Sequence, residues 1–505
     1  MNSAWGNFYK DEQLIQQLLS GLPGHIKSAR WFGGKGYSWK EVRCGHCFPF
    51  KHDDQLFYFF VAEIHYEDHE LENYLIPLAC VKDAPANAFM ALPNDEGFVV
   101  EAGNETSFHR ALFEQVVAGQ TLKSTDGSLA FERGSSVAET EKYISSRNPT
   151  IDQSNSSIFF NDKYFMKIYR KLFREMNPEV EMVRFLTEKG QYSHAPAYCG
   201  SLLWERKGIP PITFALMMNK VDASKDNWVS TGDELNDFLT AFVAGEFSLH
   251  EHVFEQVELL ARRTAEMHLA LSTRSREKAF AVEKYTQEYR SWLHDHLTDL
   301  LKRRLDMIDH HYHSLDGHAQ RMASVLRLNE KLIRRFFGQI LTRPLKSLRT
   351  RIHGDYHLGQ VLYSNNDFII IDFEGEPESS IIERKIKHSP LKDVAGMVRS
   401  FHYAVSAKLF FSLETQAMNQ ERLQKAADRW FYLIRETFTE TYLKALGKDQ
   451  RLFASKAELN FLFLLHLLEK AIYEIGYEIN GRPEWLKIPL KGIEQVINEL
   501  EKFED

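Results

Sequence analysis

The sequence lacks the features that mark secreted, membrane-spanning and nucleic-acid-binding proteins. Only four cysteines occur in 505 residues, which is too few for a disulfide framework and fits a reducing compartment. The most apolar run, Phe461 to Leu468, is too short to span a bilayer, and the N-terminus shows no signal-peptide pattern. A net charge of −8 without basic runs argues against broad nucleic-acid or membrane binding. We therefore expect a globular, cytoplasmic protein without a nucleic-acid partner.

Two groupings resemble metal sites in composition only. Cys44 and Cys47 form a CxxC, but a structural zinc site needs about four ligands and no second CxxC follows. The histidines of Asp309 to His313 lie between helical patterns, where a solvated helix end is expected. Neither grouping is therefore predicted to bind a metal.

The periodicity of apolar residues changes near residue 220. Before it, alternating strand patterns dominate, as in Leu56 to Tyr66. After it, a period of 3.6 predicts helices. These predicted helices are Glu234 to Ala244, His252 to Leu271, Thr286 to Met307, Leu326 to Leu341, Gln420 to Ala445, Leu459 to Ile479 and Ile493 to Phe503. A β-rich half followed by a helical half predicts a bilobal α+β protein.

A hairpin and a helix lie next to each other in the β-rich half. Strands at Ser156 to Phe160 and Tyr164 to Tyr169 are separated by the turn residues Asn-Asp-Lys. The following helix is marked by Asn177 as N-cap and Pro178 at its first position. This arrangement places Lys167 on a strand and Glu181 in the first turns of the helix.

The helical half contains one predicted hairpin with polar residues suited to catalysis, "HGDYHLGQVLYSNNDFIIIDFEGEP". Asp355 lies in its first turn, Gln360 follows five residues later, and Asp372 ends an apolar strand. Phosphoryl transfer requires a lysine on the phosphates, a carboxylate that orients it, oxygen ligands for Mg²⁺ and a base near the attacking hydroxyl. Each residue alone is weak evidence for a kinase. However, burial of the acids that flank these strands is costly in free energy unless a cation or hydrogen-bond donors compensate for it. The order of the set predicts a kinase.

The motifs of this hairpin resemble those of the bacterial maltokinases. That family is related to the aminoglycoside phosphotransferases and has a eukaryotic-protein-kinase-like fold. The segments "ARWFGGKG", "DQSNSSIFF" and "YEINGRPEWLKIPL" extend the resemblance over most of the chain, although nothing between about residues 290 and 346 is recognised. The resemblance implies an α+β, protein-kinase-like fold with a cap subdomain at 1–100, the remainder of the N-lobe at 101–219 and a helical C-lobe at 220–505.

The same resemblance implies a role for each candidate residue. Asp355 would be the base at the acceptor hydroxyl, Gln360 and Asp372 would bind Mg²⁺, and Lys167 with Glu181 would hold the phosphates of ATP. A serine-rich loop would cover these phosphates in place of a glycine-rich one, and adenine would meet the backbone at the end of a strand. The loop residues are Ser154, Asn155, Ser156 and Ser157, and the strand residues are Met217, Met218 and Asn219.

The candidate sugar-binding residues lie mainly near the C-terminus. Lys470, Tyr473 and Tyr477 share one helix face at i, i+3 and i+7. A tyrosine stripe at this spacing is often core, but the family resemblance implies that it lines a disaccharide pocket. Flat apolar rings and hydrogen-bonding groups suit a sugar. His353 and Trp228 are further substrate candidates.

We therefore expect a maltokinase, in which ATP and maltose give maltose 1-phosphate and ADP. The product would feed glycogen synthesis, and trehalose synthase would be a possible partner. An aminosugar kinase such as a glucosamine kinase is an alternative, for which Glu474 and Glu478 are local candidates to meet an ammonium group. An inactive nucleotide-binding scaffold is a second alternative, which the intact set of polar residues argues against.

Overall fold

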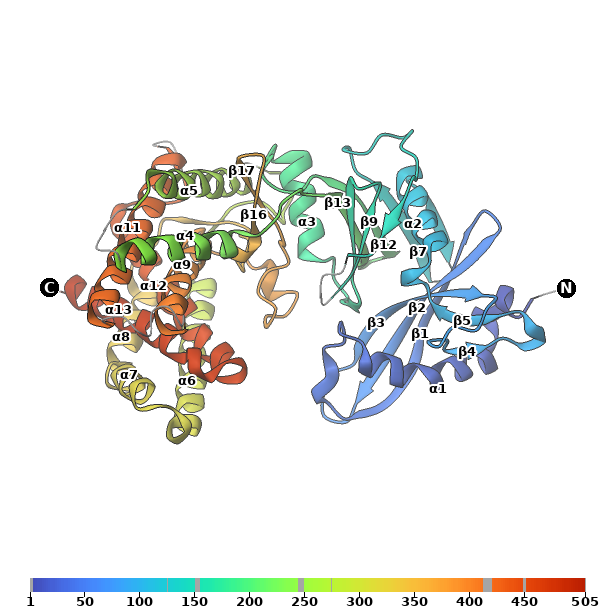
Figure 1. Cartoon of the computed structure of the whole chain (residues 1–505), viewed down its shortest axis with the longest axis horizontal. Helices are drawn as coiled ribbons and strands as arrows, with labels where there is room; N and C mark the ends of the chain where they lie inside the picture. The colour runs from blue at the N-terminus through green and yellow to red at the C-terminus, as the bar shows by residue number, and fades with distance from the viewer. Residues whose placement is uncertain are drawn as a thin grey trace. The chain divides into compact units, whose positions relative to one another are not determined.

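The computed structural model describes residues 3–124, 126–149, 155–243, 249–273, 275–411, 420–447 and 451–504 (Figure 1). The chain divides into two compact units. Unit 1 comprises Met1–Lys189 and Pro196–Lys220, and unit 2 comprises Gly190–Ala195 and Val221–Asp505. The further division of the first 219 residues into a cap and the remainder of an N-lobe remains a prediction.

Unit 1 contains a first, six-stranded antiparallel sheet with the order β1-β2-β3-β5-β4, and β11 pairs with β3. Its strands are β1 (Trp39–His52), β2 (Gln55–Tyr66), β3 (Glu72–Val81), β4 (Met90–Ala91), β5 (Phe98–Glu101) and β11 (Lys171–Leu172). Helix α1 (Glu12–Ser28) begins after Asp11, whose carboxylate caps the amides of Gln13 and Leu14. Its leucine face packs with the buried aromatic residues of this sheet.

A second, seven-stranded sheet of unit 1 has the order β6-β7-β12-β13-β10-β9-β8. Its strands are β6 (Thr121–Ser124), β7 (Gly127–Arg133), β8 (Ser146–Arg147), β9 (Ser156–Phe160), β10 (Tyr164–Ile168), β12 (Tyr198–Arg206) and β13 (Ile209–Asn219). Helix α2 (Thr106–Ala118) packs on β7 and β12. The predicted hairpin is present as β9 and β10, with Lys167 opposite Ser157.

Unit 2 is mainly helical. Its helices are α4 (Asn227–Val243), α5 (Glu251–Leu271), α6 (Gln287–His311), α7 (Gly317–Leu328), α8 (Glu330–Thr342), α9 (Leu391–Phe411), α11 (Gln420–Leu446), α12 (Lys456–Gly481) and α13 (Lys487–Glu504). Helix α12 packs against α6, α9 and α13, and α5 packs against α11 (Figure 1). Two short antiparallel pairs complete the unit: β14 (Glu283–Lys284) with β15 (Leu348–Arg349), and β16 (Val361–Ser364) with β17 (Asp367–Ile370).

Two predicted helices begin earlier in the structure, α4 at Asn227 and α13 at Lys487, and two other regions differ more strongly. Helix α9 was not predicted, because it is buried on nearly every side and therefore has no polar stripe. The single helix predicted at Leu326 to Leu341 is instead two helices, α7 and α8, that meet at Asn329. The histidines of Asp309 to His313 lie at the end of α6, as predicted.

Two further expectations concern disulfide bonds and membrane-spanning helices. The four cysteines are free thiols. Among the helices that the structure describes, none is long and apolar enough to cross a bilayer.

Candidate functional site

In unit 1, Lys167 forms an ion pair at the end of the hairpin. Its Nζ donates to Oε2 of Glu179 at 3.0 Å, and the Tyr169 hydroxyl donates to the same oxygen at 2.7 Å. Glu179 is 2% exposed, at the second position of α3 (Pro178–Arg184), where the Asn177 side chain caps its amide. A carboxylate buried to this extent requires such donors. The lysine site is therefore built within a short stretch of chain.

This pairing gives the lysine a partner that was not predicted. Glu181 is the glutamate expected from the sequence, and the structure places the Glu179 carboxylate on Lys167. The N-cap and Pro178 fix where α3 begins, but the rotation of the helix decides which glutamate faces the strand. Glu179 is buried and Glu181 is half-buried. A role for Glu181 with ATP remains a prediction.

The predicted phosphate loop lies only partly within the described residues. Ser154 lies outside the described residues, and Asn155 directly precedes β9. Ser156 begins β9, and its Oγ accepts a hydrogen bond of 2.7 Å from Nε of Arg170. Arg170 is 2% exposed and also binds the carbonyl of Leu75 on β3. Arg170 thus ties the start of β9 to the first sheet, and no pattern in the sequence marked this residue.

The residues predicted to meet adenine lie at the end of β13. This strand lies between β12 and β10, and Met217 and Met218 pair with residues on each side, with an irregularity in the pairing with β12 at this point. Their contact with adenine remains a prediction. Asn219 ends the strand and its side chain is exposed, but its amide donates to the carbonyl of Ala197.

In unit 2, the turn that contains Asp355 is held by a buried acid from α9. The amides of His353 and Gly354 donate to the two carboxylate oxygens of Asp393 at 2.7 and 2.9 Å. Asp393 is 1% exposed and also contacts Nε2 of His268 at 3.0 Å. Gly354 has a φ of +89°, which favours glycine. Asp393 and His268 were missed because they are far from the turn in sequence.

His353 is placed as a positioning residue, which corrects its prediction as a substrate contact. Its side chain is 1% exposed. Nε2 lies 2.9 Å from the carbonyl of Ile371, and Nδ1 accepts from the amide of Asp355 at 3.4 Å. With both ring nitrogens engaged inside the protein, the imidazole holds the turn against the following strand.

Asp355 is partly exposed and lies beside a cation. Lys470 Nζ donates to Oδ1 of Asp355 at 3.2 Å and to Oε1 of Glu376 at 2.8 Å. Burial acts to raise the pKa of Asp355, but the positive charge of Lys470, with smaller contributions from His357 and His353, lowers it below its ordinary value. Asp355 is therefore an anion at neutral pH, able to accept a proton from a nearby hydroxyl.

Gln360 and Asp372 meet across the hairpin formed by β16 and β17. Nε2 of Gln360 donates to Oδ2 of Asp372 at 3.0 Å. Asp372 has a φ of +63°, a left-handed conformation that is uncommon for a non-glycine residue and frequent at functional sites. This contact uses the amide nitrogen of Gln360, so a metal ligand on this residue would be the amide oxygen. Carboxylate and amide oxygens are hard donors that Mg²⁺ takes alongside phosphate oxygens, so the residue types of the predicted pair fit Mg²⁺.

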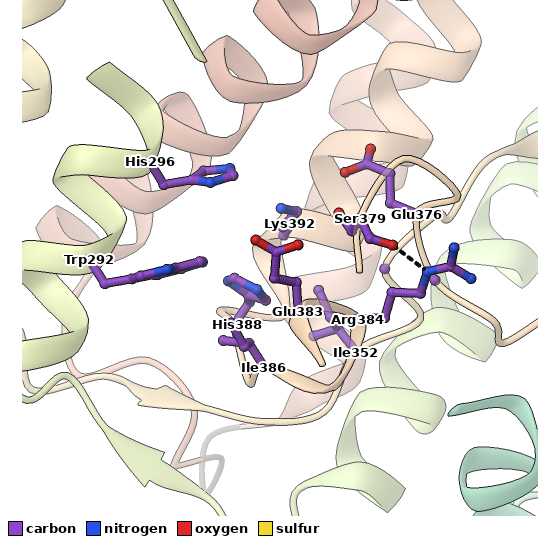
Figure 2. Close-up of a pocket in the computed structure, with 12 residues that line it drawn as sticks. Trp292, His296, Ile352, Glu376, Ser379, Glu383, Arg384, Ile386, His388 and Lys392 are labelled. Carbon is purple, nitrogen blue, oxygen red and sulfur yellow. Dashed lines mark hydrogen bonds between the residues drawn. The ribbon is translucent and has the colours of Figure 1, made fainter. Parts of the chain in front are cut away.

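A cavity of about 210 Å³ adjoins Lys470 on α12. Among its lining residues are Tyr473 and Glu376, and α6 contributes Arg304 from the stretch that resembled no known motif. A neighbouring pocket is lined by Gly354, next to Asp355, and by Trp292 of α6 (Figure 2). In Figure 2, Trp292 and His296 of α6 lie opposite a second group of residues from the segment that follows β17. This group comprises Glu376, Ser379, Glu383 and Arg384.

The other predicted sugar residues lie differently. Tyr473 is half-buried. The Nζ atom of Lys470 lies over its ring, 4.8 Å from the ring centroid. Tyr477 is 56% exposed. Trp228 lines a separate pocket between α4 and α9, so it does not join these residues.

Glu474 and Glu478 are structural acids in this arrangement. Glu474 Oε2 accepts from Nε and a terminal nitrogen of Arg399 at 3.0 and 2.6 Å. Glu478, 1% exposed, accepts from Arg482 and from the hydroxyl of Tyr403. Both carboxylates are therefore bound within the protein.

Comparisons with known proteins agree on a kinase-like fold. No family model matches the chain. It is 22% identical over 350 residues to a glucosamine kinase of Streptacidiphilus jiangxiensis, which covers 68% of this chain and 71% of the relative. A glucosamine kinase of Mycolicibacterium smegmatis is 24% identical over 355 residues, covering 69% of this chain and 79% of the relative.

A solved structure shows the fold directly. A glucosamine kinase in complex with glucosamine, ADP and inorganic phosphate matches with a TM-score of 0.67 and 16% identity. The match covers 93% of this chain and 98% of the other. The predicted α+β, kinase-like fold class is confirmed. The comparisons support the kinase superfamily that the motifs indicated, and they do not show membership of the maltokinase family.

Proposed function

We propose that this chain is an ATP- and Mg²⁺-dependent sugar kinase whose acceptor is an aminosugar. The observation that carries the proposal is the ionised Asp355 carboxylate in a rigid turn, bound to Lys470 at the edge of a small polar cavity. The glucosamine kinase relatives support the reaction class and favour an aminosugar over the maltose expected from the motifs.

In this reaction Asp355 accepts the proton of the acceptor hydroxyl as it attacks the phosphoryl group. The positive charge of Lys470 keeps the carboxylate ionised and holds it in one orientation. Removal of a positioned base of this kind typically costs about 10² to 10⁴ in rate.

The remaining parts act on the nucleotide. Lys167, oriented by Glu179, would hold the phosphates of ATP. Asp372 and Gln360 would hold Mg²⁺, which when bound neutralises charge on the phosphates. We also assign the serines before and within β9 to the phosphates through their backbone amides, since the hydroxyl of Ser156 already binds Arg170.

The size of the cavity and the acids along it favour an aminosugar. Its volume of about 210 Å³ is small compared with the roughly 300 to 1,000 Å³ typical of pockets for larger ligands, which favours one sugar ring over two. Glu376 and Glu378 line it, whereas Glu474 and Glu478 do not. Lys470 donates to Glu376 at 2.8 Å and Arg304 donates to Glu378 at 3.3 Å, and the position of these two acids in the cavity wall makes them better candidates than the two acids of α12 to meet an ammonium group.

Maltose is the second candidate, because an exposed aromatic surface continues along α12 beyond Tyr473. Arg482 lies over the rings of Tyr477 and Trp485 at 5.4 and 4.2 Å, and Trp485 stacks on Phe411. Such rings suit a second pyranose. If maltose is the acceptor, maltose 1-phosphate would be the product, and the predicted links to glycogen synthesis and trehalose synthase would follow.

The test is an acceptor screen with ATP and Mg²⁺. We expect a higher kcat/KM for glucosamine than for maltose, and Tyr477→Ala should change neither strongly. A preference for maltose, together with a loss of about tenfold or more in kcat/KM for maltose in Tyr477→Ala, would replace the aminosugar with the disaccharide. No transfer to either sugar from a folded protein would support the nucleotide-binding scaffold.

A further inference from the structure

His466 on α12 is a buried histidine in the wall of the cavity beside Lys470. Its side chain is 1% exposed, and it lines the cavity together with Glu469 and Lys470. Nδ1 of His466 lies 2.7 Å from Oε2 of Glu469, and Lys392 donates to Oε1 of the same carboxylate at 2.8 Å. The ring is thus held on one side by a fixed acid. Figure 2 shows Lys392 among the residues that line the neighbouring pocket.

The acid determines which nitrogen of the ring carries the proton. Burial acts to raise the pKa of Glu469, but Lys392 and the hydrogen bond to His466 outweigh it and hold the pKa well below its ordinary value. An ionised carboxylate can only accept, so Nδ1 carries the hydrogen that it receives. In the neutral imidazole, Nε2 then offers a lone pair as an acceptor.

Nε2 has no hydrogen-bond partner among the residues that the structure describes. Buried polar atoms are nearly always hydrogen-bonded, so an exception in a cavity wall points to a ligand. A second buried atom of the same cavity, Nε of Arg304, is also without a partner in the described part of the chain. His466 and Arg304 both line this cavity, so two residues of its wall each carry a buried nitrogen without a partner among the described residues, which a polar ligand would satisfy.

We propose that His466 determines acceptor specificity, with Nε2 accepting a hydrogen bond from a hydroxyl or ammonium group of the sugar. The proposal rests on the proposed sugar kinase function and adds a contact to it. His466 precedes Lys470 by four residues, or about 6 Å along a helix. His466 would therefore contact a part of the sugar ring that is remote from the hydroxyl facing Asp355.

The test measures KM for glucosamine, glucose and ATP in His466→Gln and His466→Phe. We expect KM for the sugar to rise about tenfold to a hundredfold and KM for ATP to stay unchanged, because one acceptor contact is lost. A rise for glucosamine alone identifies the ammonium group as the donor, and an equal rise for glucose identifies a shared hydroxyl. Unchanged sugar constants in both variants would overturn the proposal.

His402→Phe is the matched control. His402 on α9 is also 1% exposed, and its Nε2 is likewise unpartnered within the described ranges, but it binds Arg399 and does not line this cavity. We expect normal sugar constants in this variant. An equal rise in the His402 and His466 variants would mean a general effect of removing a buried histidine, and would contradict the proposal. If His466→Phe fails to fold, the smaller polar change in His466→Gln decides.

Calorimetry with glucosamine and glucose separates this proposal from the proposed function. Binding without phosphoryl transfer by the wild type would overturn the kinase function, and the affinities of the His466 variants would then decide the role of His466. Transfer by the wild type with unaltered His466 variants would overturn only the contact. Neither binding nor transfer by the wild type would overturn both.

Discussion

Lys167 in unit 1 and Lys470 in unit 2 are both largely buried ammonium groups held by carboxylates, but they are assembled differently. Lys167 meets Glu179, which lies 12 residues further along the chain. Lys470 meets Asp355 and Glu376, which lie 115 and 94 residues earlier. The first site is made by one hairpin and the helix that follows it. The second exists only after α12 has packed into the helical unit, so its geometry depends on tertiary structure.

The difference matches the tasks that we assign to the two lysines. Nucleotide phosphates are the same in every reaction of this type, and a locally built lysine suits a constant partner. The acceptor differs from one kinase to another. A site assembled from α6, α12 and the loop after Asp372 allows the residues of each of these elements to change independently.

The largest effect is expected at the acceptor side. Asp355→Asn should lower kcat by about 10² to 10⁴, because the amide cannot accept the proton of the attacking hydroxyl. Nucleotide affinity, measured by calorimetry with ADP, should remain close to that of the wild type. Near-normal turnover in a folded Asp355→Asn protein would remove this carboxylate from the mechanism.

The metal-binding pair should show two unequal effects. Asp372→Ala should raise the Mg²⁺ concentration needed for half-maximal activity much more than Gln360→Ala, since a carboxylate contributes charge and an amide only a dipole. A Mg²⁺ titration of steady-state activity measures both. If Asp372→Ala gives the wild-type curve, the metal is held by other residues.

A smaller effect distinguishes the two glutamates of α3. Glu179→Gln should raise KM for ATP about tenfold to a hundredfold, because Lys167 loses a charged partner that also binds Tyr169. Glu181→Gln, on the same helix and half-buried, is the matched control and should change KM for ATP by less. A larger increase in KM for ATP in Glu181→Gln than in Glu179→Gln would make Glu181 the functional partner of Lys167.

The smallest effect concerns stability and pH in unit 1. Burial acts to raise the pKa of Glu101, but Arg170 and His25 outweigh it and lower the pKa to about 2 from 4.5. Because the folded-state pKa is depressed, this stabilisation is present above about pH 4.5 and is lost as the pH falls toward 2. The shift corresponds to at most about 3 kcal/mol in the free energy of unfolding.

The measurement is chemical denaturation of the wild type and Glu101→Gln between pH 6 and pH 2. The difference in unfolding free energy between the two proteins should shrink as the pH falls. A difference that does not depend on pH would show that Glu101 has an ordinary pKa in the folded protein.

The sequence predicts the local parts of this molecule better than the distant ones. The hairpin of β9 and β10, the start of α3 and the hairpin after Asp355 follow from turn residues, an N-cap and alternation. Helix α9 was missed because uniform burial removes its periodic signal, and Asp393 was missed with it. Without the packing of α6 and α12, no spacing in the sequence indicates that His466 and Arg304 line one cavity.

The central claim is that the two lysines serve different substrates, and one crossed measurement tests it most directly. KM for ATP and for glucosamine would be determined in Lys167→Met and in Lys470→Met under identical conditions. We predict that Lys167→Met raises KM for ATP and leaves that for glucosamine nearly unchanged, and that Lys470→Met does the opposite while lowering kcat. If either variant raises both constants to the same extent, or if the pattern is reversed, the division of roles between the two sites is wrong.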